Sequence, residues 1–115
     1  MAKVGLHIIG DGFPVAQIGK PRIVKCVDAS VDFIRRVRAQ VGPACEIVVR
    51  WVEPNQDLSS PVDAARAWFT KHAGDMAALV GADPLIEGWN EIADSQSGAF
   101  CAFEVERMRL MYEHG

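Results

Sequence analysis

Four short segments alternate apolar and polar residues, and this pattern predicts β-strands. Successive side chains of a strand point to opposite faces, so a strand with one buried face shows a period of two. Turn-forming residues follow the first segment, at Gly10, Asp11 and Gly12. The predicted strands run from Lys3 to Ile9, Ile23 to Val27, Glu46 to Val52 and Leu85 to Trp89.

Helix signals follow each predicted strand. A short helical turn is expected around Val15 to Ile18. Ser30 is a favourable N-cap, and Gly42 is a favourable residue to end a helix that runs to about Val41. The apolar side of this helix carries Val31, Ile34, Val37 and Val41. Ser60 and Pro61 begin a helix that ends at Gly81. Its apolar stripe comprises Val62, Ala65, Trp68, Phe69, His72, Met76, Leu79 and Val80.

A last helix is predicted from Gly98 to His114. Its apolar side carries Phe100, Phe103, Arg107, Met108 and Met111. The charged residues of this segment are interpreted as a solvated helix face with partial pairing; they are Glu104, Glu106, Arg107, Arg109 and Glu113.

The order strand–helix, repeated four times with short loops, requires parallel strands and right-handed crossovers. Either an open doubly wound sheet or part of a (β/α)8 barrel fits this order. One face of the predicted strands carries His7, Lys25, Arg50 and Glu87. Strands covered by helices on both faces are apolar throughout, whereas a barrel lumen with a polar mouth accepts such residues. The pattern therefore favours a barrel, and we expect Lys25, Arg50 and Glu87 to form a charge-paired layer.

The chain has 115 residues, about half of the roughly 250 that a complete barrel takes. We therefore predict an α/β fold in which residues 1–115 form a single domain, a (β/α)4 half of a TIM barrel. Four parallel strands alone would leave two unpaired edges and an uncovered inner face. Dimerisation through these strand edges would close an eight-stranded barrel.

The composition of the chain excludes some classes of binding partner. With 12 Lys+Arg against 15 Asp+Glu the net charge is −3, which offers no basic face for nucleic acid. No apolar run is long enough to span a membrane, and the first residues show no signal peptide, so a cytoplasmic location is expected. Cys26, Cys45 and Cys101 match no zinc spacing and are interpreted as reduced thiols. No metal or cofactor is expected.

The segment from Leu85 to Glu91, Leu-Ile-Glu-Gly-Trp-Asn-Glu, resembles the fourth-strand signature of clan A glycoside hydrolases. These are TIM-barrel enzymes with an Asn-Glu pair at the end of strand four. The resemblance implies that Glu91 is the catalytic acid/base and that Asn90 binds the sugar 2-hydroxyl. Segments 4–7, 23–27 and 47–51 fit the family's first three strands in order.

The resemblance also implies a carbohydrate ligand, with Trp89, Trp51, His7 and Arg50 as candidate binding residues. The family's nucleophilic Glu lies on strand seven, which this chain lacks, and glycoside hydrolysis needs two carboxyl groups. Little or no catalysis is therefore expected from the chain alone. The plainer interpretations are that the tryptophans are core residues, His7 is a hydrogen-bonded interior residue and Glu91 is a loop carboxylate.

Three functions remain open. The first is a half-barrel that self-associates to complete a TIM-like barrel. The second is a glycosidase acting on O-glycosidic bonds, whose nucleophile comes from another chain or a missing half. The third is a doubly wound domain that binds a small ligand at the carboxyl ends of its strands.

Overall fold

A computed structural model describes residues 5–89 and 92–114 of the chain. They fold into two compact units. The first, which we call the sheet unit, comprises the described residues of Met1–Val52 and Ala78–Glu87. The second, the helical unit, comprises those of Glu53–Ala77 and Gly88–Gly115.

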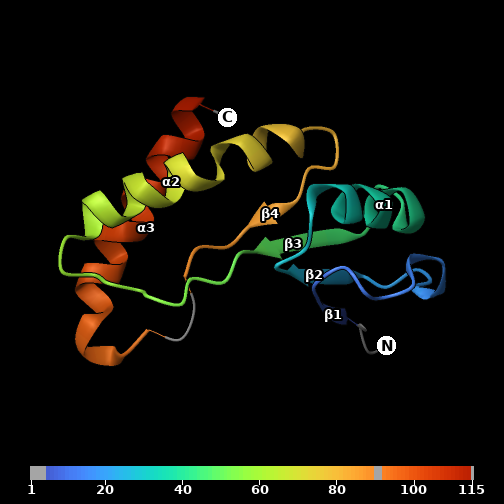
Figure 1. The fold of residues 1–115 in the computed structure, drawn as a ribbon, viewed down its shortest axis with the longest axis horizontal. Helices are drawn as coiled ribbons and strands as arrows, with labels where there is room; N and C mark the ends of the chain where they lie inside the picture. The colour runs from blue at the N-terminus through green and yellow to red at the C-terminus, as the bar shows by residue number, and fades with distance from the viewer. Residues whose placement is uncertain (1–4, 90–91, 115) are drawn as a thin grey trace. The chain divides into compact units, whose positions relative to one another are not determined.

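The sheet unit contains a four-stranded parallel sheet (Figure 1). Its strands are β1 (Gly5–Ile9), β2 (Ile23–Val27), β3 (Glu46–Arg50) and β4 (Leu85–Ile86), and they pair in the order β1-β2-β3-β4. The α/β class and the parallel strands that the sequence predicted are confirmed.

Two strands end earlier than the alternating pattern predicted. After Arg50, the N–H of Val52 donates to the Asp28 carboxylate at 2.7 Å, so the chain leaves the β-ladder there. Glu87 still donates its N–H to the Val49 carbonyl at 2.9 Å. The next residue, Gly88, belongs to the helical unit, where an added Cβ would collide with the Glu104 carboxylate. The bond of Val52 to the Asp28 side chain therefore ends β3 early.

Helix α1 (Val31–Val41) packs on one face of the sheet, as Figure 1 shows. The Ser30 hydroxyl accepts a hydrogen bond from the Phe33 N–H at 3.1 Å, and Gly42 ends the helix with a φ of 80°. These are the predicted cap and stop. The core between helix and sheet consists mainly of Ile8, Val24, Cys26, Ile47, Val49, Phe33, Ile34, Val37 and Val41.

The predicted turn near Val15 is the 3-10 helix η1 (Val15–Gln17). Phe33 is fully buried, although the predicted stripe did not include it, and Val31 of that stripe is half-buried and packs against the same core. Phe33 lies one helical turn before Val37, which is also fully buried, so both side chains face the sheet.

The helical unit contains α2 (Pro61–Ala78), the 3-10 helix η2 (Asp94–Gln96) and α3 (Ser97–His114). The buried residues of α2 are Ala65, Trp68 and His72, a narrower stripe than the sequence pattern predicted. Val62 and Val80 of that pattern are exposed, and so is Met108 of α3.

The interpretation of the α3 charges as a solvated face is wrong for Glu106 and Arg107, which are both buried. The Arg107 guanidinium lies over the Trp68 ring, 4.9 Å from its centroid, and pairs with Glu104 at 2.6 Å. A guanidinium can be buried in this way because its flat face packs on an indole while its edge keeps a carboxylate.

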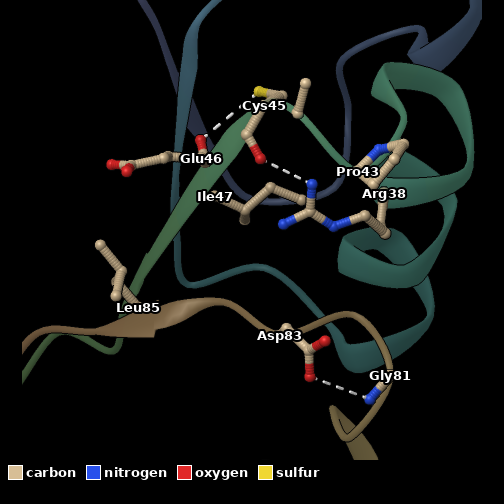
Figure 2. A pocket seen from close by; sticks show the side chains of 9 residues that line it. Arg38, Pro43, Cys45, Glu46, Ile47, Gly81, Asp83 and Leu85 are labelled. Carbon is tan, nitrogen blue, oxygen red and sulfur yellow. Dashed lines mark hydrogen bonds between the residues drawn. The ribbon is translucent and has the colours of Figure 1, made fainter.

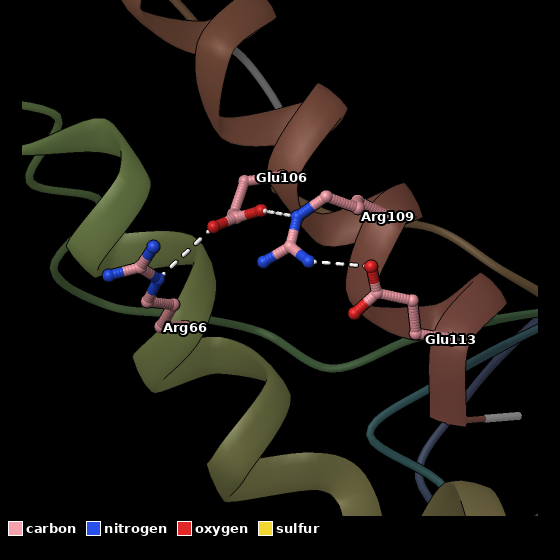
Figure 3. A network of polar contacts seen from close by, with 4 residues as sticks. All are labelled: Arg66, Glu106, Arg109 and Glu113. Carbon is pink, nitrogen blue, oxygen red and sulfur yellow. Dashed lines mark hydrogen bonds and ion pairs between the residues drawn. The ribbon is translucent and has the colours of Figure 1, made fainter.

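Glu106 connects the two long helices of this unit (Figure 3). Its carboxylate accepts hydrogen bonds from Arg109 on its own helix and from Arg66 of α2, the latter at 3.1 Å. The hydrogen bond from Arg109 is the main cause that holds the pKa of Glu106 below its usual value. Arg109 in turn bonds Glu113 at 2.7 Å. The network keeps Glu106 ionised and links α3 to α2.

No helix in the described part of the chain combines the length and the apolarity needed to cross a bilayer.

Candidate functional site

The face of the sheet that points away from α1 carries charged side chains, and we call it the polar face. Its residues alternate with the core residues along each strand, so His7, Lys25, Arg50 and Glu87 share it. The register places Lys25 beside His7 of β1 and Val48 of β3. Arg50 lies two residues beyond Val48, at the carboxyl end of β3. The alternation read from the sequence therefore grouped these four side chains correctly.

Glu87 accepts contacts from two cations on this face. Lys25 Nζ lies 2.9 Å from Glu87 Oε2, and Arg50 Nε lies 3.8 Å from the same oxygen. The predicted charge-paired layer of Lys25, Arg50 and Glu87 is confirmed. The exposed fractions of the three side chains are 27%, 16% and 41%, so the layer is half-buried rather than sealed from water.

Two aspartates join the loops at the carboxyl end of the sheet. The Asp11 carboxylate accepts the N–H of Ser30 at 2.7 Å, and the Asp28 carboxylate accepts that of Val52 at the same distance. Asp28 has a φ of 52°, in the left-handed region that Asp tolerates better than most residues. Sequence reasoning missed this role. Each carboxylate ties the loop after one strand to the loop after the next strand.

The candidate binding residues belong to both units, and each is described within its own unit. His7 and Arg50 lie on the polar face, whereas Trp51 packs against the core that α1 covers. Trp89 belongs to the helical unit, where its ring stacks on Phe103 at 4.4 Å between centroids. The predicted acid/base Glu91 and its neighbour Asn90 lie outside the described residues.

The helical unit contains a cavity of about 250 Å³ beside Trp89. Its polar lining includes Asn55 and the ion pair of Lys71 with Glu53, at 3.4 Å. Asp57 also lines it, and the Ser59 backbone N–H lowers the pKa of that carboxyl. Sequence reasoning singled out only Trp89 here, because nothing in the pattern brings residues 53–57 against α2.

A second cavity, of about 380 Å³, lies in the sheet unit at the amino ends of β3 and β4 (Figure 2). Arg38 points into it and donates to the carbonyls of Cys45 at 2.6 Å, Gly42 at 2.7 Å and Ala82 at 2.8 Å. These three bonds join the end of α1 to the starts of two strands. The arginine therefore acts as a structural clamp.

The buried thiols are poor candidates for chemistry. Burial, reinforced by Cys45 and Asp11, raises the pKa of Cys26 to about 11, so this thiol stays protonated at neutral pH. Cys45 is buried as well, and Cys101 is exposed. Within residues 5–89 and 92–114, no three or more His, Cys, Asp or Glu side chains gather as a metal ion would require.

Comparisons of the chain with protein-family models, with curated proteins and with solved structures found no match in any of the three.

Proposed function

We propose that the chain is a half-barrel that self-associates through its strand edges to complete a TIM-like barrel, with little or no catalysis alone. The observation that carries this proposal is the strand order, β1-β2-β3-β4 with every neighbour parallel. A doubly wound sheet reverses its strand order near the middle and binds ligands at that reversal. An uninterrupted order is typical of a barrel. The order therefore argues against the doubly wound alternative.

The sheet edges support self-association. Within the described strands, β1 pairs with β2 alone and β4 with β3 alone. Gly10 donates its N–H to Val27 of β2, and backbone groups alternate in direction along a strand. The N–H of Ile9 therefore points to the free side of β1. Free edges are sites for pairing with another strand, and a two-fold dimer would pair β4 with β1 twice.

The side chains of the polar face also suit a barrel interior. They are half-buried charges, and two of them, Arg50 and Glu87, lie at or just beyond the carboxyl ends of their strands, the end at which barrels keep their polar mouth. The resemblance to the first half of clan A glycoside hydrolases implies a barrel fold as well. The glycosidase alternative rests on that resemblance, because Asn90 and Glu91 lie outside the described residues.

The edge of β1 offers a direct test. Ile9 is 74% exposed, so substitutions there remove little core packing. Ile9→Pro deletes the outward N–H, which a solvated edge tolerates and a paired edge does not. Ile9→Val keeps the N–H and is the matched control. Sedimentation velocity is expected to give a dimer for the native chain and for Ile9→Val, and a monomer for Ile9→Pro. A dimeric Ile9→Pro variant, or a monomeric native chain, would overturn the proposal.

A further inference from the structure

Two cations share one carboxylate on the polar face, near the carboxyl end of β3. Lys25 and Arg50 both approach Glu87, and no other described carboxylate forms an ion pair with either cation. Glu46 lies on the same face, but four residues before Arg50, about 13 Å away along the strand.

Arg50 is the cation with one donor nitrogen that lacks an acceptor among the described residues. Its side chain is 16% exposed, and its buried Nε has no hydrogen-bond acceptor among the described residues. Glu87 is too distant for a hydrogen bond to this nitrogen, because its Oε2 lies close to Lys25 instead. A guanidinium with an unpaired donor favours an oxyanion, because its planar group can bind one through two parallel hydrogen bonds.

We propose that Arg50 and Lys25 form a binding site for a small oxyanion, a phosphate or carboxylate group, on the polar face. Arg50 supplies the directional hydrogen bonds, and Lys25 adds a second positive charge. His7, in register with Lys25, borders the site. Arg50 lies at the carboxyl end of its strand, the end of a parallel sheet where ligands of α/β proteins bind. All of its residues belong to the sheet unit, so it requires no second copy of the chain.

Titration with inorganic phosphate tests the proposal. Ionic strength is kept constant with chloride, and binding is followed by calorimetry and by the NMR signal of the Arg50 Nε–H. Saturable binding of one phosphate per chain, with a shift of that signal, is expected. A parallel titration with acetate determines whether the site prefers phosphate or carboxylate. Absence of saturable binding of both anions would overturn the site.

Substitutions assign the binding to these residues. Arg50→Gln and Lys25→Gln are each expected to weaken binding at least about tenfold, since each removes a charge-assisted contact. The control is Arg36→Gln, because Arg36 is an exposed arginine of α1 that pairs with Asp32. This variant is expected to bind as the native chain does. Equal binding by Arg50→Gln and the native chain would contradict the assignment.

Glu87→Gln separates ligand binding from a purely structural role of the cations. The substitution keeps the size of the side chain but removes the negative charge that competes for Lys25 and Arg50. The oxyanion is then expected to bind several-fold more tightly. Unchanged or weaker binding would mean that the cations serve only the ion pairs of the sheet. Sedimentation of the same samples reports the oligomeric state, so failure of the oxyanion site is distinguishable from failure of self-association.

Discussion

Lys25 of β2 forms an ion pair with Glu87, which follows β4, across the intervening strand β3. The contact is 2.9 Å long and joins two strands that share no backbone hydrogen bonds. β4 contains only two residues, so this ion pair and the Glu87 N–H bond to β3 help to hold it in the sheet.

Removing the carboxylate should destabilise the sheet moderately. We expect Glu87→Ala to lower the free energy of unfolding by about 1–2 kcal/mol, between the values typical of exposed and of buried ion pairs. Breaking a fully buried ion pair would cost about 3–5 kcal/mol. We expect a smaller loss here because the Glu87 side chain is 41% exposed. Glu87→Gln should cost less, since an amide can still accept a hydrogen bond.

Urea denaturation measures these differences. Asp32→Ala is the control, because it removes an exposed ion-pair partner of Arg36 and should change stability by less than about 0.5 kcal/mol. Equal losses for Asp32→Ala and Glu87→Ala would show that the ion pair on the polar face contributes no more than a surface pair.

Asp28 should contribute to the stability of the fold through the hydrogen bond of its carboxylate and through its backbone conformation. Asp28→Ala removes the acceptor of the Val52 N–H and places alanine at a φ of 52°, so we expect a loss of about 2–3 kcal/mol. Asp28→Asn keeps an acceptor oxygen and a residue that tolerates this conformation, and it should cost less than half as much. Thermal unfolding of both variants provides the comparison. A larger loss for Asn than for Ala would contradict the described role of the side chain.

The Cys26 thiol should make stability fall at alkaline pH. Its pKa is about 11 in the folded chain against 9.0 for an unperturbed cysteine, so the unfolded chain releases this proton first. Stability contributed by the protonated thiol is complete below pH 9 and decreases by up to about 1.4 kcal/mol per pH unit toward pH 11. Urea denaturation between pH 8 and 10.5 should show a shallower decrease for Cys26→Ala than for Cys101→Ala. Parallel decreases would count against the burial of this thiol.

Little or no turnover of activated aryl glycosides is expected from the isolated chain. One general acid contributes about 10²–10⁴-fold, and the second carboxylate that hydrolysis needs is not provided by the part of the family fold that this chain resembles. Glu91→Gln assayed in parallel should behave as the native chain does. Turnover that this substitution abolishes would show that another carboxylate completes the site and would favour the glycosidase alternative.

Local signals in the sequence were sufficient for most of the sheet unit. Ser30 and Gly42 marked the ends of α1, and alternation placed Lys25, Arg50 and Glu87 on one face. These features depend on residues near in sequence or on the period of a strand. The early end of β3 depends on Asp28, which is 24 residues from Val52, so no local pattern contains it.

The helical unit was harder to predict for the same reason. Burial of Arg107 depends on the indole of Trp68, and burial of Glu106 on Arg66, both from another helix. A pattern of charges along one helix cannot show which of them meets such a partner. The cavity beside Trp89 likewise forms only when residues 53–57 fold against α2.

Self-association is the central claim, and its most direct measurement is the mass of the native chain over a hundredfold dilution, with the melting temperature recorded at each concentration. We expect twice the mass of one chain at high concentration, and a melting temperature that falls on dilution because folding and association are linked. A monomeric mass at every concentration, with an unchanged melting temperature, would contradict it.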